Sequence, residues 1–208
     1  MRKNLILICF CALLTISCSQ KKTSLFNGRD LSGWVFVTDS TSQEDASQTF
    51  TASNGLIHIS GQPFGYMRTE QKFSNFVLHT EWRWSGEPAD GGIFVMLQDG
   101  DRVWPTGLQC QMKGGELGML MGGIPIAGVE APNGFYKKGL EDETQVEKPA
   151  GEWNETEITC NDGHVTVTIN GVLVNEAHCE AKEGYIGFQS EGGPLEIRNL
   201  YLIPITGE

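Results

Sequence analysis

Hydrophobic and polar residues alternate with a period of two along much of the chain. Because successive side chains of a strand point to opposite faces, this alternation predicts half-buried β-strands. No window sustains the 3.6-residue period of a long helix. Gly, Asn, Asp and Pro punctuate the pattern, and the predicted strands cover residues 56–60, 76–84, 92–97, 107–112, 156–160, 164–169, 172–177, 185–189 and 195–203.

The segment 160–175 gives the clearest local structure. Its two pairs Asp162-Gly163 and Asn170-Gly171 tolerate the positive φ that two-residue hairpin turns demand, and Val or Ile alternates with Thr between them. We therefore predict a three-stranded meander with one buried face. Many short strands at regular spacing predict a single all-β domain, a jelly-roll β-sandwich whose two sheets enclose one core.

The first residues differ from the rest of the chain. A short basic start precedes an apolar run at 5–16, which is too short to span a membrane, and small residues then precede Cys18. This end resembles the lipobox of bacterial lipoproteins, in which the cysteine is lipidated and becomes the first mature residue, although Thr15 stands where leucine is usual. A plain signal peptide that merely contains a cysteine is the alternative.

We accordingly predict a signal peptide at 1–17, a linker at 18–24 that starts at the lipidated Cys18, and one β-sandwich domain at 25–206. After Cys18 the linker continues Ser-Gln-Lys-Lys and carries no acidic cluster of the kind that sends some lipoproteins to the cell surface. The prediction is therefore a lipid anchor in the envelope of a Gram-negative bacterium, with the domain facing the periplasm.

The charge balance narrows the ligand class. The formal net charge is −11, and loss of Arg2 and Lys3 with the signal takes it to −13. A protein this acidic is not expected to bind nucleic acid or anionic lipid surfaces. Its charge favours cationic ligands or neutral ones, and sugars are neutral. The cysteines left in the domain, Cys110, Cys160 and Cys179, allow one disulfide at most and do not suggest a structural zinc site.

Common catalytic motifs are absent from the sequence: there is no GxSxG, HExxH, P-loop or dinucleotide-binding glycine pattern. Carboxylates, amides and aromatic residues remain, and these are the groups that pair with sugar hydroxyls and stack on sugar rings. In the strand at 76–84, alternation directs Trp82 and Trp84 to the core and His79, Glu81 and Arg83 to the opposite face. The glycine-rich stretch 113–151 is expected to be a long loop over a cleft.

Five segments resemble a known family in the right order: LFNGRDLSGW at 25–34, FVLHTEWRW at 76–84, GGIFV at 91–95, PAGEWN at 149–154 and IGFQSEGGPLEIRN at 186–199. The family is the 3-keto-disaccharide hydrolase, or 3-keto-glucoside 1,2-lyase, domain family. The resemblance implies a concanavalin A-like sandwich and cleavage of 3-keto-glycosides. It also implies functional pairing with a sugar 3-dehydrogenase, which would make the small oxidised glycoside.

The implied reaction removes the C2 proton beside the C3 ketone, so it needs a base, a group that stabilises the enolate and an acid for the leaving group. We predict Glu81 as acid or base with His79 as its alternate, and Arg83 as the group that keeps Glu81 ionised or stabilises the enolate. A divalent metal could replace Arg83, but no ligand cluster requires one. The predicted substrate-binding residues are Gln109, Gln111, Gln189, Glu191, Asp90, Glu116, Arg68 and, for stacking on a sugar, Trp104.

One departure from the family pattern keeps other functions open. The sequence Gln109-Cys110-Gln111-Met112 stands where the family commonly has Glu-Val-Gln-Ile, and an amide cannot act as a general acid or base. Asp90 or Glu116 could substitute for the missing carboxylate. Otherwise the protein is a lectin-like sugar-binding lipoprotein, or a conventional glycoside hydrolase that pairs Glu81 with Glu116 or Glu191.

Overall fold

A computed structural model describes residues 21–43, 45–130, 134–140 and 146–206. The predicted signal peptide and Cys18 therefore lie outside the described residues. Two antiparallel sheets pack face to face, and a single turn of 3-10 helix, η1 (Ala46–Gln48), accompanies them. Within the described ranges, no helix has the length and apolar character needed to cross a bilayer. The prediction of an all-β sandwich is confirmed.

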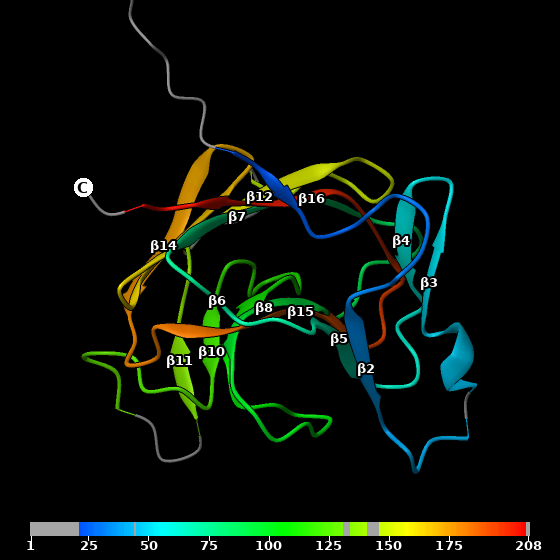
Figure 1. The fold of residues 1–208 in the computed structure, drawn as a ribbon, viewed down its shortest axis with the longest axis horizontal. Coiled ribbons are helices and arrows are strands. Elements are labelled where there is room, and N and C mark those ends of the chain that lie inside the picture. The colour runs from blue at the N-terminus through cyan, green and yellow to red at the C-terminus, as the bar shows by residue number, and fades with distance from the viewer. Residues whose placement is uncertain (1–20, 44, 131–133, 141–145, 207–208) are drawn as a thin grey trace, which may run out of the picture.

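Each sheet has eight strands. Sheet A runs in the order β14 (Val172–His178), β13 (His164–Ile169), β12 (Asn154–Asn161), β7 (Phe76–Trp84), β16 (Leu195–Pro204), β4 (Leu56–Ile59) and β3 (Phe50–Ser53), and β1 (Thr23–Ser24) pairs with β16. Sheet B runs β11 (Phe135–Lys137), β10 (Leu120–Gly122), β9 (Leu108–Gln111), β8 (Gly92–Leu97), β15 (Glu183–Ser190), β5 (Gly65–Thr69) and β2 (Trp34–Thr38), and β6 (Phe73–Ser74) pairs with β15. Figure 1 shows the two layers, with β12, β7 and β16 above β8, β15 and β5.

The predicted meander forms as β12, β13 and β14, with one shift of register between Val167 and Thr168 where β13 pairs with β14. Its two turns have the expected left-handed backbone, with φ of 49° and 83° at Asp162 and Gly163 and of 49° and 81° at Asn170 and Gly171. One face of β13 is buried at every second residue. Local turn chemistry and alternation therefore determine this part of sheet A.

The glycine-rich stretch 113–151 is not only a loop, because it contains β10 and β11, which extend sheet B beyond β9. Gly122 in β10 has a φ of 144°, and a Cβ there would lie 2.0 Å from the carbonyl oxygen of Gly107. Glycine thus allows two backbones to approach closely, while the same composition in the sequence resembles a loop.

Large side chains fill the space between the sheets, as predicted for Trp82 and Trp84. Their exposed fractions are 0% and 1%, and their rings meet edge to face with centroids 6.0 Å apart. The Trp82 indole Nε1 donates a hydrogen bond of 2.9 Å to the Thr156 hydroxyl on β12. The cysteines Cys110, Cys160 and Cys179 are free thiols, and burial raises the pKa of Cys110 to about 12.

Candidate functional site

The polar row on β7 and the glutamines lie on different sheets. His79, Glu81 and Arg83 occupy the outer face of sheet A, whereas Gln109 on β9 and Gln189 on β15 occupy the outer face of sheet B. The core between the sheets separates the two faces. The residues predicted to be catalytic therefore do not share a cleft with the glutamines predicted to bind the substrate, because alternation assigns a face of a strand but not the sheet that the strand joins.

The side chains on β7 that were predicted to be catalytic form ion pairs with other residues of sheet A. Glu81 accepts hydrogen bonds from Arg198 Nε at 2.7 Å and from the Asn199 amide. Burial alone would raise the pKa of Glu81, but the hydrogen bonds from Asn199 and Arg198 outweigh it and hold the pKa below its usual value. A carboxylate held in the charged form is a weak base, so this environment does not suit proton abstraction.

Arg83 does not pair with Glu81 as expected. Its guanidinium lies 2.6–2.7 Å from the Glu196 carboxylate and stacks on the Trp153 ring at 4.6 Å from the centroid. Arg198 stacks on the same ring at 4.0 Å. These contacts link β7 and β16 on the outer face of sheet A. The Arg83 guanidinium is bound by other groups of the protein.

His79 stacks on Tyr201 with ring centroids 4.5 Å apart, and its Nδ1 lies 3.4 Å from Glu157 Oε1. His79, Glu155 and Glu157 place one ligand atom each within 4.8 Å of one another, a spacing that could hold a metal ion. No other such group occurs in the described part of the chain. This group lies on the outer face of sheet A, so it is separate from the predicted substrate residues.

Most of the predicted substrate-binding residues do meet in one groove on sheet B. Its volume is about 470 Å³, which is large enough for a sugar ring, and it opens to solvent. The residues that line it are Asp90, Trp104, Gln109, Gln111, Lys113, Glu116, Met119, Met121, Tyr136, Gln189 and Glu191. We call this the sheet B groove.

A chain of amides runs along the floor of the groove. Gln109 Nε2 donates to Gln111 Oε1 at 2.8 Å and to Gln189 Oε1 at 2.9 Å, and Gln189 Nε2 donates to Glu191 Oε2. The three glutamines have exposed fractions of 3–7%. Gln109 is thus the centre of a satisfied hydrogen-bond network.

Glu191 is the titratable group at the end of this chain. Burial and the nearby Asp90 carboxylate raise the pKa of Glu191 to about 7, against the opposing effects of Lys113 and of the hydrogen bond from Gln189. Lys113 Nζ lies 3.3 Å from Asp90 Oδ2 and 3.7 Å from Glu116 Oε2. The groove therefore combines a carboxyl group that titrates near neutrality with a fixed positive charge.

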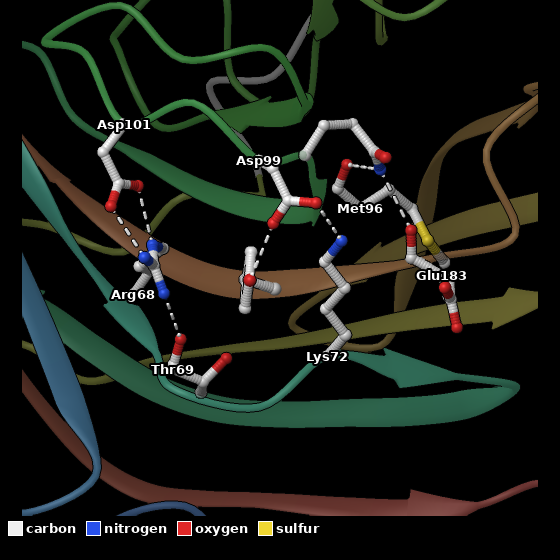
Figure 2. Close-up of polar contacts among 9 residues, drawn as sticks. Arg68, Thr69, Lys72, Met96, Asp99, Asp101 and Glu183 are labelled. Carbon is white, nitrogen blue, oxygen red and sulfur yellow. Dashed lines mark hydrogen bonds and ion pairs between the residues drawn. The ribbon is translucent and has the colours of Figure 1, made fainter.

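Arg68 is not among the residues that line the sheet B groove, contrary to prediction. Its guanidinium makes a bidentate pair with Asp101 at 2.7–2.8 Å, and Lys72 pairs with Asp99 at 2.7 Å. Figure 2 shows both carboxylates, from the segment after β8, reaching to Arg68 on β5 and to Lys72 just after β5. These ion pairs fasten the segment that carries Trp104 to sheet B. Arg68 therefore positions a wall of the groove and does not itself line the groove.

Sequence reasoning missed Lys113, Met119, Met121 and Tyr136. A signal for Lys113 was present, because it continues the alternation of Gln109 and Gln111 by one more step of two residues. Met121 and Tyr136 belong to β10 and β11, which lie in the stretch expected to be a loop. Their place on the groove follows from the pairing of these strands with β9.

A family model of the 3-keto-alpha-glucoside-1,2-lyase-like domain matches residues 21–203. The chain belongs to this family. Membership in the 3-keto-alpha-glucoside-1,2-lyase-like family supports a carbohydrate-active function of the glycosidase kind. No protein of curated function matches the sequence.

Solved structures share the fold at low sequence identity. A "putative glycosyl hydrolase" from Parabacteroides distasonis aligns with a TM-score of 0.61 and 20% identity, over 89% of this chain and 94% of that one. The β-glucanase of Bacillus licheniformis aligns with a TM-score of 0.57 and 11% identity, over 88% and 97%. The carbohydrate-binding module CBM66 of Bacillus subtilis gives 0.55 and 12%, over 81% and 93%. These likenesses show the jelly-roll fold, which hosts both enzymes and binding modules.

Proposed function

We propose that the protein cleaves 3-keto-glycosides by removing the proton on C2. The ketone at C3 acidifies this proton, and the enolate that forms expels the aglycone from C1. Addition of water to the resulting 2-hydroxy-3-keto-glucal completes a net hydrolysis. No covalent nucleophile is required, so the chemistry depends on a base, a cation for the enolate oxygen and positioned hydroxyl contacts.

The environment of Glu191 is the observation that carries this proposal. A general base works best when its pKa is near the working pH, and Glu191 has a pKa of about 7 in a groove of sugar size. We assign Glu191 as the base at C2. This role replaces the one predicted for Glu81, which lies on the other sheet.

Lys113 is the candidate for stabilising the enolate, since its ammonium group is the cation on the groove wall beside Glu191. Asp90 and Glu116, on either side of Lys113, are the carboxyl groups left to protonate the leaving oxygen. The amides of Gln109, Gln111 and Gln189 orient sugar hydroxyls, and Trp104 offers an aromatic face.

The deciding assay incubates the purified protein with a 3-keto-disaccharide and follows both the ultraviolet absorbance of the enone and the release of free sugar. We expect turnover of the oxidised substrate and none of the unoxidised parent disaccharide. Calorimetric binding of the unoxidised sugar without turnover of the 3-keto form would instead establish the lectin-like alternative, which the amide at Gln109 motivates.

Substitution Gln109→Glu should move the pH profile. The new carboxylate would be buried near Glu191, so its charge should raise the pKa of Glu191 and shift the midpoint of kcat/KM against pH above 7. It also cannot donate to Gln111 and Gln189, which should lower the free energy of unfolding by about 1–3 kcal/mol. The exposed Gln71→Glu is the matched control, and an unmoved midpoint in Gln109→Glu would contradict this assignment of Glu191.

The cellular setting proposed for this activity follows from the chemistry and the N-terminal sequence. The ketone must be introduced by an oxidation, so we expect a sugar 3-dehydrogenase to act first. The proposed lipid on Cys18 would hold the domain at the periplasmic face of the envelope. Labelling of cells with radioactive palmitate should mark the wild-type protein and not Cys18→Ser, and equal labelling of the two would contradict the anchor.

A further inference from the structure

The sheet B groove continues past Trp104 into a second hollow of about 360 Å³. Four residues, Trp104, Gln109, Met121 and Tyr136, line both hollows. The others that line the second hollow are Phe94, Arg102, Pro105, Gly107, Gly122, Gly123 and Gly134. The shared walls make the two hollows compartments of one groove, and we call the second the aglycone compartment.

The two compartments differ in chemistry. The first holds Asp90, Glu116, Glu191 and Lys113, whereas Arg102 is the charged side chain among the described residues that line the aglycone compartment. The Arg102 guanidinium is already engaged, since it donates to the carbonyl oxygen of Trp104 at 2.9 Å and to the Thr106 hydroxyl. A second sugar ring needs partners around its rim, and this compartment supplies few from side chains.

Aromatic faces and bare backbone shape the aglycone compartment. Trp104 and Tyr136 are 54% and 51% exposed, which is unusual for such large side chains when they serve only to pack a core. Gly122 cannot be replaced without a Cβ meeting the oxygen of Gly107, and Gly134 has a φ of 127°. Glycines on the walls therefore leave room beside the two aromatic faces, on which a planar ring can stack.

The Trp104 side chain is held in place before any ligand arrives. Its ring centroid lies 6.0 Å from that of Phe64, and the Arg68 pair with Asp101 ties its segment to sheet B. A preorganised aromatic side chain loses little entropy when a ring stacks on it. Trp104 is therefore exposed to ligand and already fixed in position for stacking.

We propose that this compartment binds a planar aromatic aglycone, so that the preferred substrates are 3-keto-glycosides of phenols. The proposal rests on the proposed function. In the reaction Glu191 takes the C2 proton, the C2–H electron pair becomes the second bond of the C1=C2 double bond, and the C1–O bond breaks. The phenol oxygen keeps the electron pair of the C1–O bond and takes up a proton. No oxidant or reductant is needed in this step.

The leaving group also fits the acid–base groups of the groove. A phenol has a pKa of about 10, far below that of a sugar hydroxyl, so it departs with less help from a general acid. Gln109, which lines both compartments, is an amide and cannot act as a general acid. An aromatic aglycone makes a carboxyl group at that position unnecessary.

The test compares phenyl and methyl 3-keto-glucosides with wild-type protein, Trp104→Ala and Gly123→Leu. The three atoms nearest to a Cβ at Gly123 all belong to Thr106, at ordinary contact distances of 3.5–3.7 Å, so a leucine at this lining position can narrow the compartment while the tryptophan stays. Gly123→Leu should lower kcat/KM for the phenyl substrate by about ten-fold, and for the methyl substrate by less than about two-fold. Trp104→Ala, whose side chain also lines the sheet B groove, should lower kcat/KM for both substrates, and for the phenyl substrate by about ten-fold more than for the methyl substrate. Leu173→Ala, which is 53% exposed on sheet A, is the matched control and should change neither value.

Equal losses for the two substrates, or no loss for the phenyl substrate, would overturn the aromatic subsite. Calorimetry with unoxidised phenyl glucoside distinguishes this failure from a failure of the lyase function. If no 3-keto substrate is turned over, binding of phenyl glucoside that Trp104→Ala and Gly123→Leu both weaken about ten-fold still supports the compartment. Binding that neither variant weakens removes it.

Discussion

Replacement of Glu191 by glutamine should lower kcat for a 3-keto-glucoside by about a thousand-fold, within the range that general bases contribute. The amide keeps the shape of the side chain but cannot accept the C2 proton. Because the neutral amide also removes a partly buried carboxyl group, the fold should be retained. Enone absorbance measures the rate, and thermal unfolding confirms the fold.

The same change on the other sheet is the comparison that matters. Glu81→Gln removes an ion pair with Arg198 on the outer face of sheet A, remote from the groove, so kcat should stay within about two-fold of wild type. Loss of turnover in Glu81→Gln together with normal turnover in Glu191→Gln would return the catalytic role to β7.

The pH dependence follows from the raised pKa of Glu191. The base is active when deprotonated, so kcat/KM should rise with pH through about 7 and level off above it. Between its ordinary value and about 7 this carboxyl group binds a proton in the folded state that the unfolded chain has released, so its contribution to stability is lost as pH rises through that window. Urea unfolding of wild type and Glu191→Gln at pH 5 and pH 8 should show this loss in the wild type alone.

Replacement of Trp82 by alanine should cost about 3–5 kcal/mol in the free energy of unfolding, as removal of a fully buried aromatic side chain does. The cavity would open between the sheets against Trp84, and the Thr156 hydroxyl would lose its donor. Urea denaturation monitored by circular dichroism gives the value.

Trp104→Ala is the matched comparison, because it removes the same side chain from a position that is 54% exposed. We expect a loss below about 1 kcal/mol there. A comparable loss in both variants would mean that the segment carrying Trp104 is part of the folding core, contrary to the structure.

Strands with an unbroken alternation could be predicted from the sequence almost residue by residue. The bounds of β7, β8 and β13 are those predicted, because each strand buries one face or both and is stopped by turn residues. Strands β5 and β10 were missed, since Gly65 and Gly122 interrupt a pattern that is already short. In both strands glycine permits close contact with a neighbouring backbone, at Val37 and Gly107, and that neighbour is distant in sequence.

The candidate site could likewise be predicted only in part from the sequence. Gln109 and Gln111 could be identified because amides on alternate positions of one strand must share a face. The place of Glu81 could not, because only the pairing of β7 with β12 and β16 puts it in sheet A. Glu191 follows β15, in sheet B, and the burial that raises its pKa comes from segments far away in the chain.

The hydrogen bonds among the three glutamines fix which groups on the floor of the sheet B groove can donate or accept. Both N–H bonds of the Gln109 amide are used on Gln111 and Gln189, so toward a ligand this residue offers only its oxygen. The Gln111 oxygen accepts one hydrogen bond and keeps a second lone pair, so Gln111 can both donate and accept. A sugar must therefore present a hydroxyl hydrogen at Gln109, whereas either a hydroxyl or a ketone can pair with Gln111. The groove can thus distinguish a ketone, which only accepts, from the hydroxyl it replaces, according to which amide that carbon faces.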